Sequence, residues 1–338
     1  MVDATHISFA ASDRSYFSLI KKDIRQRALN AGMLEAKVNQ IDLVVAEMTS
    51  NLFKYADQGE ILLGVFENNA NPYIELISLD HGPGIAQPSR MMEDGISTTN
   101  TMGYGLGSMK RLSDHFEIYS LVGWGTIVLS RIYNTIPNSK KKNVVSIHPL
   151  IVSKPGEAVS GDGMAIKQNE KFIKIMLADG LGHGPEANLA VNEAASAFKV
   201  CPDFSPSDTL RYIHQSIKKT RGAVANVLCY EFSANKWTSA GIGNILFKLM
   251  GPVAVKNHMS YNGIVGHNIP NTMNDQQYDG SQYNLAILCS DGIKTRWEIN
   301  KYPMIGKYDP TILCAALYKD QARRTDDMSI VAIKTKQR

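Results

Sequence analysis

Cysteine is scarce in this sequence of 338 residues, and the few cysteines present exclude a common kind of metal site. Cys201, Cys229, Cys289 and Cys314 lie far apart, without a C-x-x-C pair and without a His-x-x-x-His partner. A zinc site with the usual ligand spacing is therefore not indicated. This cysteine usage is typical of a cytosolic chain.

Long hydrophobic runs and a strong excess of one charge are also missing. No stretch approaches the roughly 20 apolar residues that span a bilayer, and the start MVDATHISFA lacks the basic patch and apolar core of a signal peptide. The 36 basic and 32 acidic residues leave a net charge of +4, which is too small for a phosphate-binding basic stripe. We therefore expect a cytoplasmic protein without a membrane role and without a nucleic-acid partner.

The composition indicates compact folding in two domains. Hydrophobic residues make up 44% of the chain and charged residues 20%, which is enough apolar surface to offset the ordering entropy. The clearest seam is NTIPNSKKKN at 134–143, which has no apolar periodicity. We therefore predict a domain at 1–133, a linker at 134–143 and a domain at 144–338. The lysines at 140–142 are interpreted as part of a solvated linker rather than a nucleic-acid arm.

The first half has the periodicities of helices followed by paired strands. A helix is predicted over Ser12–Ala31, and a second over Val38–Tyr55, where apolar residues recur at steps of three and four. The strand-like runs EILLGVF and YIELISL form one pair, and HFEIYSL and GTIVLSRIY form another, joined at a Gly-Trp-Gly turn. The predicted fold class is α+β, with helices stacked on one face of a mixed, mostly antiparallel sheet.

The second half is richer in strands. The runs VVSIHPLIVS, KFIKIMLAD, VANVLCYEF, ILFKLM, YNLAILCS and MSIVAIK are typical of strands, with helical segments near 184–199, 206–220 and 309–319. This pattern predicts a β-sandwich flanked by helices.

Three elements of the first half could together handle a nucleotide. Glu47 and Asn51 lie four residues apart and share one helix face, where a carboxylate can accept a proton and a carboxamide oxygen suits magnesium. Asp80 begins DHGPGI directly after a strand, and Gly82 and Gly84 allow backbone to approach a ligand. GYGLG at 103–107 opens a helix whose N-H groups suit phosphate. A solvated helix face and an ordinary turn remain alternatives for the first two elements taken singly.

In this order, these elements resemble the Bergerat-type ATP-binding fold, called GHKL, that gyrase, Hsp-type chaperones, histidine kinases and MutL share. The runs NLFKYADQGEILLGV and GYGLGSMKRLSDHFEIYSLVGWGTIV resemble the small serine kinases of the RsbT type within it. Because only 46 residues precede Glu47, too few for the paired helices of a histidine kinase, we do not expect histidine-kinase chemistry.

The resemblance implies a role for each residue of the first half that matches it. Glu47 would be the general base toward a substrate serine, Asn51 would bind Mg²⁺, and Asp80 would read adenine. The implied ATP-binding residues are Asn51, Asp80, Gly82, Gly84, Gly103, Gly105, Gly107 and Thr126. The implied cofactor is ATP with Mg²⁺. Only 18 residues separate Gly84 from Gly103, which indicates a short nucleotide lid.

Four aspartates of the second half stand where strands begin or end. They are Asp162 in SGDGMAI, Asp179 in MLADGLGHG, Asp291 in LCSDGI and Asp326 in RRTDDMSIVAI. Carboxylates placed this way can converge at one end of a sandwich, where oxygen ligands suit Mn²⁺ or Mg²⁺. Two such ions about 3.5 to 4 Å apart can hold a nucleophilic water and bind phosphoryl oxygens. An Asp-Gly turn remains the alternative for any one of them.

These residues resemble the metal-dependent serine/threonine phosphatases of type 2C, in the SpoIIE and RsbX branch. The resemblance implies two Mn²⁺ or Mg²⁺ ions, with Asp162, Asp179, Asp291, Asp326 and the Gly180 carbonyl as ligands. Asp326 is preferred to Asp327 because the family pattern D-[DN]-x-[ST] places the ligand first. His183 is either a proton donor to the leaving serine or a hydrogen-bonding residue at a helix start. The phosphate-grasping arginine that eukaryotic relatives carry near the N-terminal strand is not evident.

The two resemblances imply a bacterial signalling protein that joins a serine-kinase-like domain to a phosphatase. Its implied partners are STAS-type proteins, RsbS-like or RsbR-like, of a stressosome or partner-switching pathway, and self-association into a homo-oligomer stays open. Two opposed activities would waste ATP, so we expect them to be alternately controlled, or one domain chiefly to dock the partner. The alternatives are an ATP-sensing module that sequesters a partner without transferring phosphate, an ATP-driven clamp, and an inactive phosphatase scaffold.

Overall fold

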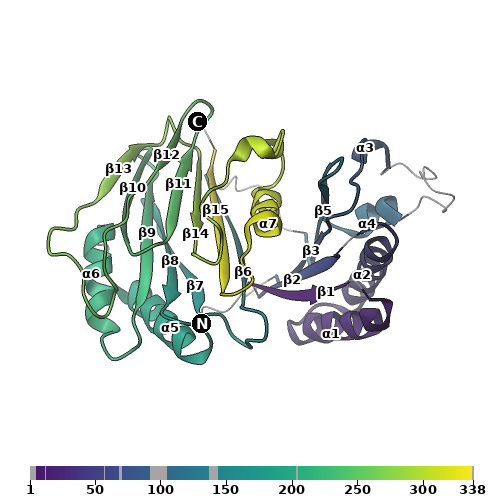
Figure 1. Ribbon diagram of the computed structural model, residues 1–338, viewed down its shortest axis with the longest axis horizontal. Helices are drawn as coiled ribbons and strands as arrows, with labels where there is room; N and C mark the ends of the chain where they lie inside the picture. Colours follow the sequence, from purple (N-terminus) through teal and green to yellow (C-terminus); the bar gives the residue numbers. More distant parts are fainter. Residues whose placement is uncertain are drawn as a thin grey trace. The chain divides into compact units, whose positions relative to one another are not determined.

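The computed structural model describes residues 5–11, 13–56, 58–67, 71–91, 105–136, 144–202 and 205–336 (Figure 1). Contacts within the chain divide it into two compact units. The first unit holds Thr5–Lys142 together with Asn300–Ala316, and the second holds Asn143–Ile299 and Leu317–Arg338. No helix of the described ranges is long and apolar enough to cross a bilayer.

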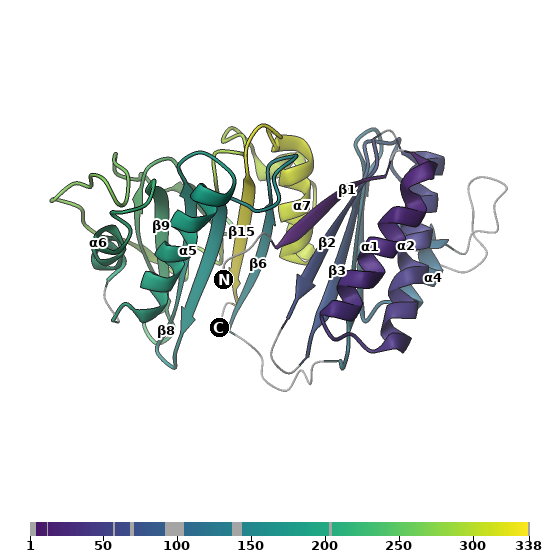
Figure 2. The ribbon, with the colours of Figure 1, turned by 90° about the horizontal axis from the view of Figure 1, so that it is seen from below.

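The first unit is a five-stranded antiparallel sheet with helices on one face. Its strands are β1 (His6–Ala10), β2 (Glu60–Phe66), β3 (Tyr73–Leu79), β4 (His115–Leu121) and β5 (Gly125–Tyr133), in the order β1-β2-β3-β5-β4. Its helices are α1 (Phe17–Asn30), α2 (Glu35–Tyr55), α3 (Pro88–Met91) and α4 (Gly105–Leu112), and a 3-10 turn at Arg14–Tyr16 precedes α1. Figure 2 shows α1 and α2 side by side on the same face of the sheet. The predicted α+β class is confirmed.

The apolar stripe of α2 forms the core of this unit, as its spacing predicts. Val38, Ile41 and Met48 are buried against α1 and against the helix-facing residues of the strands. Tyr55 departs from the stripe, because at the last turn of α2 its side chain is 43% exposed. Helix α2 also begins three residues earlier than the apolar spacing indicates, at Glu35.

The second unit is a sandwich of two antiparallel sheets. One sheet has the order β12-β11-β14-β15-β6 and the other β13-β10-β9-β8-β7. The strands are β6 (Val145–Val152), β7 (Asp162–Gln168), β8 (Phe172–Gly180), β9 (Ala223–Glu231), β10 (Lys236–Ile242), β11 (Leu246–Met250), β12 (Val255–Asn257), β13 (Gln276–Asp279), β14 (Leu285–Cys289) and β15 (Met328–Thr335).

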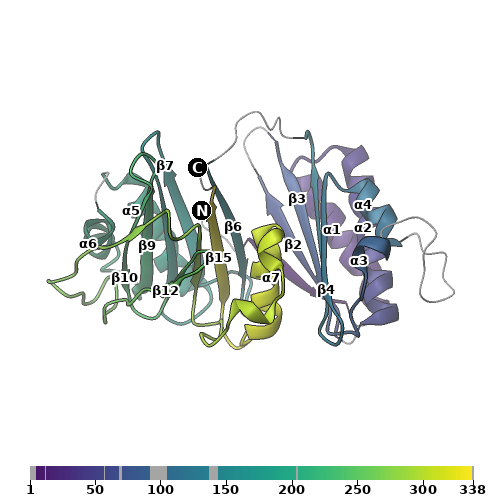
Figure 3. The same ribbon diagram turned by 90° about the horizontal axis from the view of Figure 1, so that it is seen from above.

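Two apolar layers hold this sandwich together. Between the sheets, Ile175 and Trp237 pack in one cluster with Phe247 and Val331. On the outer face of the second sheet lie α5 (Pro185–Val200) and α6 (Pro206–Ser216) (Figure 3). Phe198 of α5 is buried there in another cluster. The predicted β-sandwich with flanking helices is confirmed.

The segment Asn300–Ala316 lies late in the chain, yet its contacts place it in the first unit. It contains a 3-10 turn at Ile305–Lys307 and the start of α7 (Pro310–Gln321). The Tyr119 hydroxyl donates to the Pro303 carbonyl over 3.2 Å, and the Trp124 ring meets the Tyr302 ring edge-on at 5.9 Å. Residues far apart in sequence therefore complete this unit.

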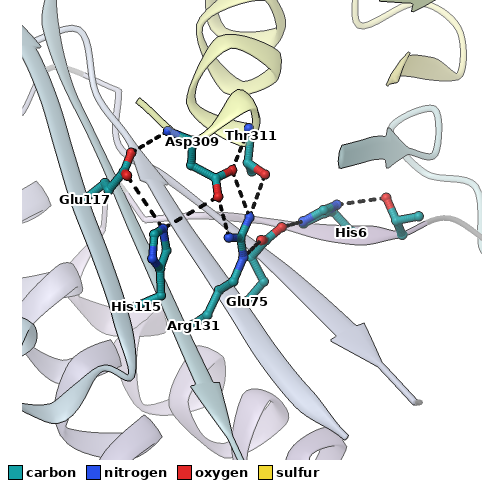
Figure 4. A network of polar contacts seen from close by, with 8 residues as sticks. His6, Glu75, His115, Glu117, Arg131, Asp309 and Thr311 are labelled. Atoms are coloured by element: carbon teal, nitrogen blue, oxygen red, sulfur yellow. Dashed lines mark hydrogen bonds and ion pairs between the residues drawn. The ribbon is translucent and has the colours of Figure 1, made fainter. Parts of the chain in front are cut away.

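A buried polar network fixes the segment to β3 and β5 (Figure 4). The Arg131 guanidinium donates from Nε to Glu75, from Nη1 to Asp309 Oδ2 over 2.7 Å and from Nη2 to Thr311 Oγ1 over 2.7 Å. His6 Nε2 donates to the other Glu75 oxygen over 2.9 Å. Burial alone would raise the pKa of Glu75, but the charge of Arg131 and the hydrogen bond from His6 outweigh it, so the pKa lies below its ordinary value.

We expect Glu75→Gln to destabilise the protein by about 1.5–3 kcal/mol at pH 7, because Arg131 keeps Asp309 but loses its charged hydrogen bond to Glu75. Since the pKa of Glu75 is lowered on folding, its stabilisation is present above the unfolded-state pKa of 4.5 and is lost as the pH falls through the folded-state value. The difference from wild type in urea unfolding should therefore shrink toward acid pH. The control Asp23→Asn removes the exposed ion pair with Arg27 and should cost less than about 1 kcal/mol. Equal losses in the two variants would contradict this account.

Candidate functional site

Helix α2 carries Glu47 and Asn51 to the start of α4. A Cβ added to Gly105, the first residue of α4, would lie 2.9 Å from Glu47 Oε2 and 3.6 Å from Asn51 Oδ1. A side chain at position 105 would therefore crowd both groups. The first N-H groups of an α-helix lack partners within the helix, so the start of α4 favours an anion. Gly107 is buried in the same helix, and Gly103 lies outside the described residues.

A second group of predicted residues surrounds Asp80 at the end of β3. Asp80 Oδ1 accepts a hydrogen bond from the Gly82 N-H over 2.8 Å and one from the Thr126 N-H over 3.2 Å. Thr126 is buried, and its hydroxyl lies 2.9 Å from that of Ser120. The strand ends of β3 and β5 thus fix the Asp80 carboxylate in one orientation.

Glycines give the backbone its close approach around Asp80. A Cβ on Gly82 would lie 2.3 Å from the Tyr55 carbonyl oxygen at the end of α2. At Gly84, where φ is +73°, a Cβ would lie 2.0 Å from the Leu121 carbonyl oxygen. The loop that follows Asp80 thus lies against the end of α2, and Gly105 lies against Glu47 and Asn51. A groove of about 680 Å³ in this unit lies elsewhere, between β1 and α1.

The turn Gly123–Gly125 offers a matched test of the proposed role of Asp80 in ATP binding. A Cβ on Gly125, where φ is +118°, would lie 2.1 Å from the Asp80 carbonyl oxygen, whereas one on Gly123, where φ is +78°, would meet nothing within 4 Å. We expect Gly125→Ala to weaken ATP binding at least about tenfold, since backbone strain of about 1–3 kcal/mol would fall on Asp80. Gly123→Ala should cost only about 1–2 kcal/mol of stability and leave ATP binding unchanged. Calorimetric titration with ATP measures both, and equal ATP affinities in the two variants would refute the assignment.

In the second unit, a cavity of about 380 Å³ is lined by three of the four predicted aspartate ligands and by Gly180, whose carbonyl is also a predicted ligand. Asp179 and Gly180 end β8, Asp291 follows β14, and Asp326 precedes β15. The other lining residues are Leu181, Gly182, Val224, Gly243, Asn244, Asn262 and Gly263. The described lining thus contains acidic, carboxamide and small residues, and no lysine, arginine or histidine.

Asp162, the fourth predicted ligand, lies directly across from Asp179 in the β7–β8 pairing. It is 1% exposed and is not part of the cavity lining. The Ser290 and Ser329 hydroxyls each donate to its Oδ2 over 2.6 Å. Directly opposite residues share one face of a sheet, so Asp162 places a second carboxylate next to Asp179.

The adjacent acids Asp326 and Asp327 have different surroundings. Asp326 lines the cavity, whereas Asp327 is 3% exposed. The carboxylate of Asp327 accepts from the Lys154 N-H and the Gly161 N-H, each over 2.9 Å. Asp327 therefore holds the backbone on two sides, and Asp326 is the one of the pair that faces the cavity.

Two carboxyl groups at this site have strongly perturbed pKa values. Burial is the largest cause that raises the pKa of Asp179, and the charges of Asp162, Asp291, Asp326 and Asp327 add to it. Burial also raises the pKa of Asp162, although its two serine hydroxyls oppose the shift. Such crowding of carboxylates favours a bound cation or a bound proton.

The donor set fits hard divalent cations, which take carboxylate, carbonyl and water oxygens. Among the described residues, no three acidic, histidine or cysteine side chains are close enough to form a metal cluster as they stand. Cations that bind here would have to draw the carboxylates together.

Two polar residues of the lining were missed by the sequence analysis. Asn244 donates from Nδ2 to Asp291 Oδ2 over 2.8 Å, and Asn262 lies in the same lining. In the sequence, Asn244 is marked only by its place at the end of the glycine-containing run SAGIGN at 239–244. His183 is outside the lining, and its Nδ1 lies 2.6 Å from Glu157 Oε1.

Comparison with known proteins finds one matching family model and relatives of two kinds, a kinase and a phosphatase. Residues 11–132 match the family model of the histidine kinase-like ATPase domain. The serine/threonine-protein kinase RsbT of Bacillus subtilis (strain 168) is 36% identical over 87 residues, which cover 26% of this chain and 65% of RsbT. The phosphoserine phosphatase RsbX of the same organism is 31% identical over 105 residues, which cover 30% of this chain and 51% of RsbX. The chain thus spans about two thirds of one relative and half of the other.

Solved structures share the fold. A structure described as the bacterial stressosome, a modular system adapted to control secondary messenger signalling, superposes with a TM-score of 0.52 and 24% identity, covering 56% of this chain and 99% of that chain. RsbX in complex with magnesium superposes with a TM-score of 0.50 and 20% identity, covering 58% of this chain and 98% of that one. The resemblances to an RsbT-like kinase and to an RsbX-like phosphatase are thereby confirmed.

Proposed function

We propose that this chain is a signalling enzyme that removes phosphate from phosphoserine or phosphothreonine at the Asp179 cavity and binds ATP with Mg²⁺ at the Glu47–Asp80 site. Its proposed partners are STAS-type regulators of a partner-switching pathway, which the ATP site phosphorylates. The single observation that carries the proposal is the cavity where Asp179, Asp291 and Asp326 meet without a basic residue in the described lining. Such a site suits cations that in turn bind phosphate.

At the cavity, the residues of the chain would hold two Mn²⁺ or Mg²⁺ ions. The proposed ligands are Asp162, Asp179, Asp291, Asp326 and the Gly180 carbonyl. When bound, the ions would supply positive charge toward the phosphoryl oxygens and lower the pKa of a bound water. Asn244 orients Asp291 through its hydrogen bond, and Ser290 and Ser329 orient Asp162. Asp327 keeps the neighbouring backbone in place.

In the first unit, each residue would have a separate task toward the nucleotide. The Asp80 carboxylate, oriented by the Gly82 and Thr126 N-H groups, would accept the exocyclic amine of adenine. The start of α4 at Gly105 would meet the phosphates, and Asn51 would hold the Mg²⁺. Glu47, next to Asn51 on this face of α2, would accept the proton of the attacking serine hydroxyl.

The experiment uses the intact chain and one phosphoserine peptide from a STAS-type protein. We expect phosphate release that requires Mn²⁺ or Mg²⁺ and stops with a chelator. In a second reaction, labelled ATP and the unphosphorylated STAS protein should give a labelled partner. Release that persists with the chelator would contradict the phosphatase assignment. Partner capture with ATP but without labelling would reject the kinase activity and leave an ATP-sensing, partner-sequestering module.

A further inference from the structure

A phosphorylated substrate meets a problem of charge at the acidic cavity. A phosphoserine carries about −1.5 to −2 charges at neutral pH. The described lining contributes three carboxylates and no basic side chain, so any positive charge from the protein must come from its rim. The residues next to the lining are therefore the place to look for a group that recognises phosphate.

Arg221 stands at this rim, in the segment between α6 and β9. Its Nη1 lies 3.2 Å from the position that a Cβ would occupy on Gly182, which lines the cavity. The Leu181 N-H donates to the Gly222 carbonyl over 3.1 Å, so the two loops are joined at this point. Val224, three residues after Arg221, is itself part of the lining.

The guanidinium is held at one side and open at the other. Arg221 Nε lies 2.6 Å from Glu186 Oε2, with side-chain exposures of 50% and 67%. The Arg221 carbonyl accepts from His267 Nε2 over 2.8 Å, which anchors the backbone of the segment. The two terminal nitrogens make no hydrogen bond to the described residues. An exposed ion pair contributes little to stability. Glu186 therefore orients the Arg221 guanidinium, and breaking this pair costs little free energy.

We propose that Arg221 binds the phosphate of the phosphoserine or phosphothreonine substrate and supplies the positive charge that the cavity lining lacks. This inference rests on the proposed phosphatase function. Guanidinium binds phosphate oxygens in a bidentate manner, and a lysine at the same place would act only as a point charge. Lys218 and Lys219, which precede Arg221 in the same segment, are exposed. Arg221 is a substrate-binding residue, and its ion pair is with Glu186 and not with a proposed metal ligand.

The test measures Arg221→Gln, Arg221→Lys and Glu186→Gln with the phosphoserine peptide and with inorganic phosphate as product inhibitor. For Arg221→Gln we expect the KM for the peptide and the inhibition constant for phosphate each to rise about 10- to 100-fold, because a charged hydrogen bond is lost. Arg221→Lys should show a smaller rise in both constants. Glu186→Gln should lower both the KM for the peptide and the inhibition constant for phosphate. The concentration of Mn²⁺ that gives half activity should not change.

The matched control is Lys236→Gln. Lys236 of β10 is also partly exposed and is paired with a glutamate, Glu231. Glu231 is the last residue of β9, whereas Ala223, next to the Arg221 segment, is the first. Lys236→Gln should leave all constants unchanged. Unaltered KM and phosphate inhibition in Arg221→Gln would overturn the proposal while the phosphatase function stands. If wild type released no phosphate, the proposed function would fail, and equilibrium binding of the labelled phosphopeptide would still decide the role of Arg221 by its loss or retention in Arg221→Gln.

Discussion

Replacing Asp179 with asparagine is expected to lower metal-dependent phosphate release by at least about 10³-fold, since metal ions supply several kcal/mol of charge stabilisation in such reactions. Asp179 lines the cavity together with Asp291 and Asp326, and it lies across the strand pair from Asp162. The change removes one negative charge from the place where the carboxylates crowd together. Release of phosphate from a phosphoserine peptide at saturating Mn²⁺ measures the effect. A variant that retained wild-type release would contradict the metal site.

The adjacent pair Asp326 and Asp327 provides the internal control. Asp326→Asn should also lose metal-dependent release, because Asp326 faces the cavity. Asp327→Asn should retain the metal requirement and instead lose about 1–3 kcal/mol of stability, because two backbone N-H groups lose a charged acceptor. The reverse pattern would show that the ligand is the second aspartate of the pair.

The same site should show a pH dependence with a defined sign. Burial and neighbouring charges raise the pKa of Asp179, so protons compete with the cation as the pH falls. The Mn²⁺ concentration for half activity should therefore decrease as the pH rises from about 6 to 8. A requirement that did not vary with pH would mean that the carboxylate is ionised throughout this range.

The second large effect concerns Glu47. We expect Glu47→Gln to reduce transfer of labelled phosphate from ATP to a STAS partner by about 10²- to 10⁴-fold, which is the usual contribution of a general base. Glutamine preserves the shape of the side chain next to Gly105 and removes its basicity. ATP affinity should stay close to that of wild type, because Asp80 and the start of α4 provide the proposed nucleotide contacts.

The control for Glu47 is another glutamate of the same helix. Glu35→Gln changes the first residue of α2, which is 76% exposed and paired with Arg25 at 3.3 Å. It should leave both transfer and ATP binding unchanged. Equal loss in Glu35→Gln and Glu47→Gln would indicate damage to α2 rather than loss of a base.

The sequence predicts those parts of the fold that local patterning determines. The apolar spacing from Val38 to Leu52 defines the buried face of α2, and alternation defines most strands. The aspartates of the second half could be predicted to lie close together, because each stands near the end of a strand. Strand ends of a sandwich can converge at one end of the domain. Three of them line one cavity, as expected, whereas Asp162 is buried beside it.

Features that depend on distant contacts could not be predicted. Tyr302, Asp309 and Thr311 of the segment Asn300–Ala316 contact β5 and the turn before it. No local pattern couples these residues to Arg131 or Trp124. The carboxamide of Asn244 belongs to the cavity only because the turn after β10 brings it to Asp291. Arg221 likewise reaches the rim of the cavity through the contact between two loops. No local pattern in the sequence shows that contact, so this arginine could not be predicted.

The most direct test of the account is the anomalous scattering of manganese in crystals of the intact chain. We predict manganese peaks in the cavity, within bonding distance of Asp179, Asp291 and Asp326, and their loss in Asp179→Asn. The absence of any peak there, at a Mn²⁺ concentration that supports phosphate release in solution, would contradict the assignment of this cavity as the catalytic centre.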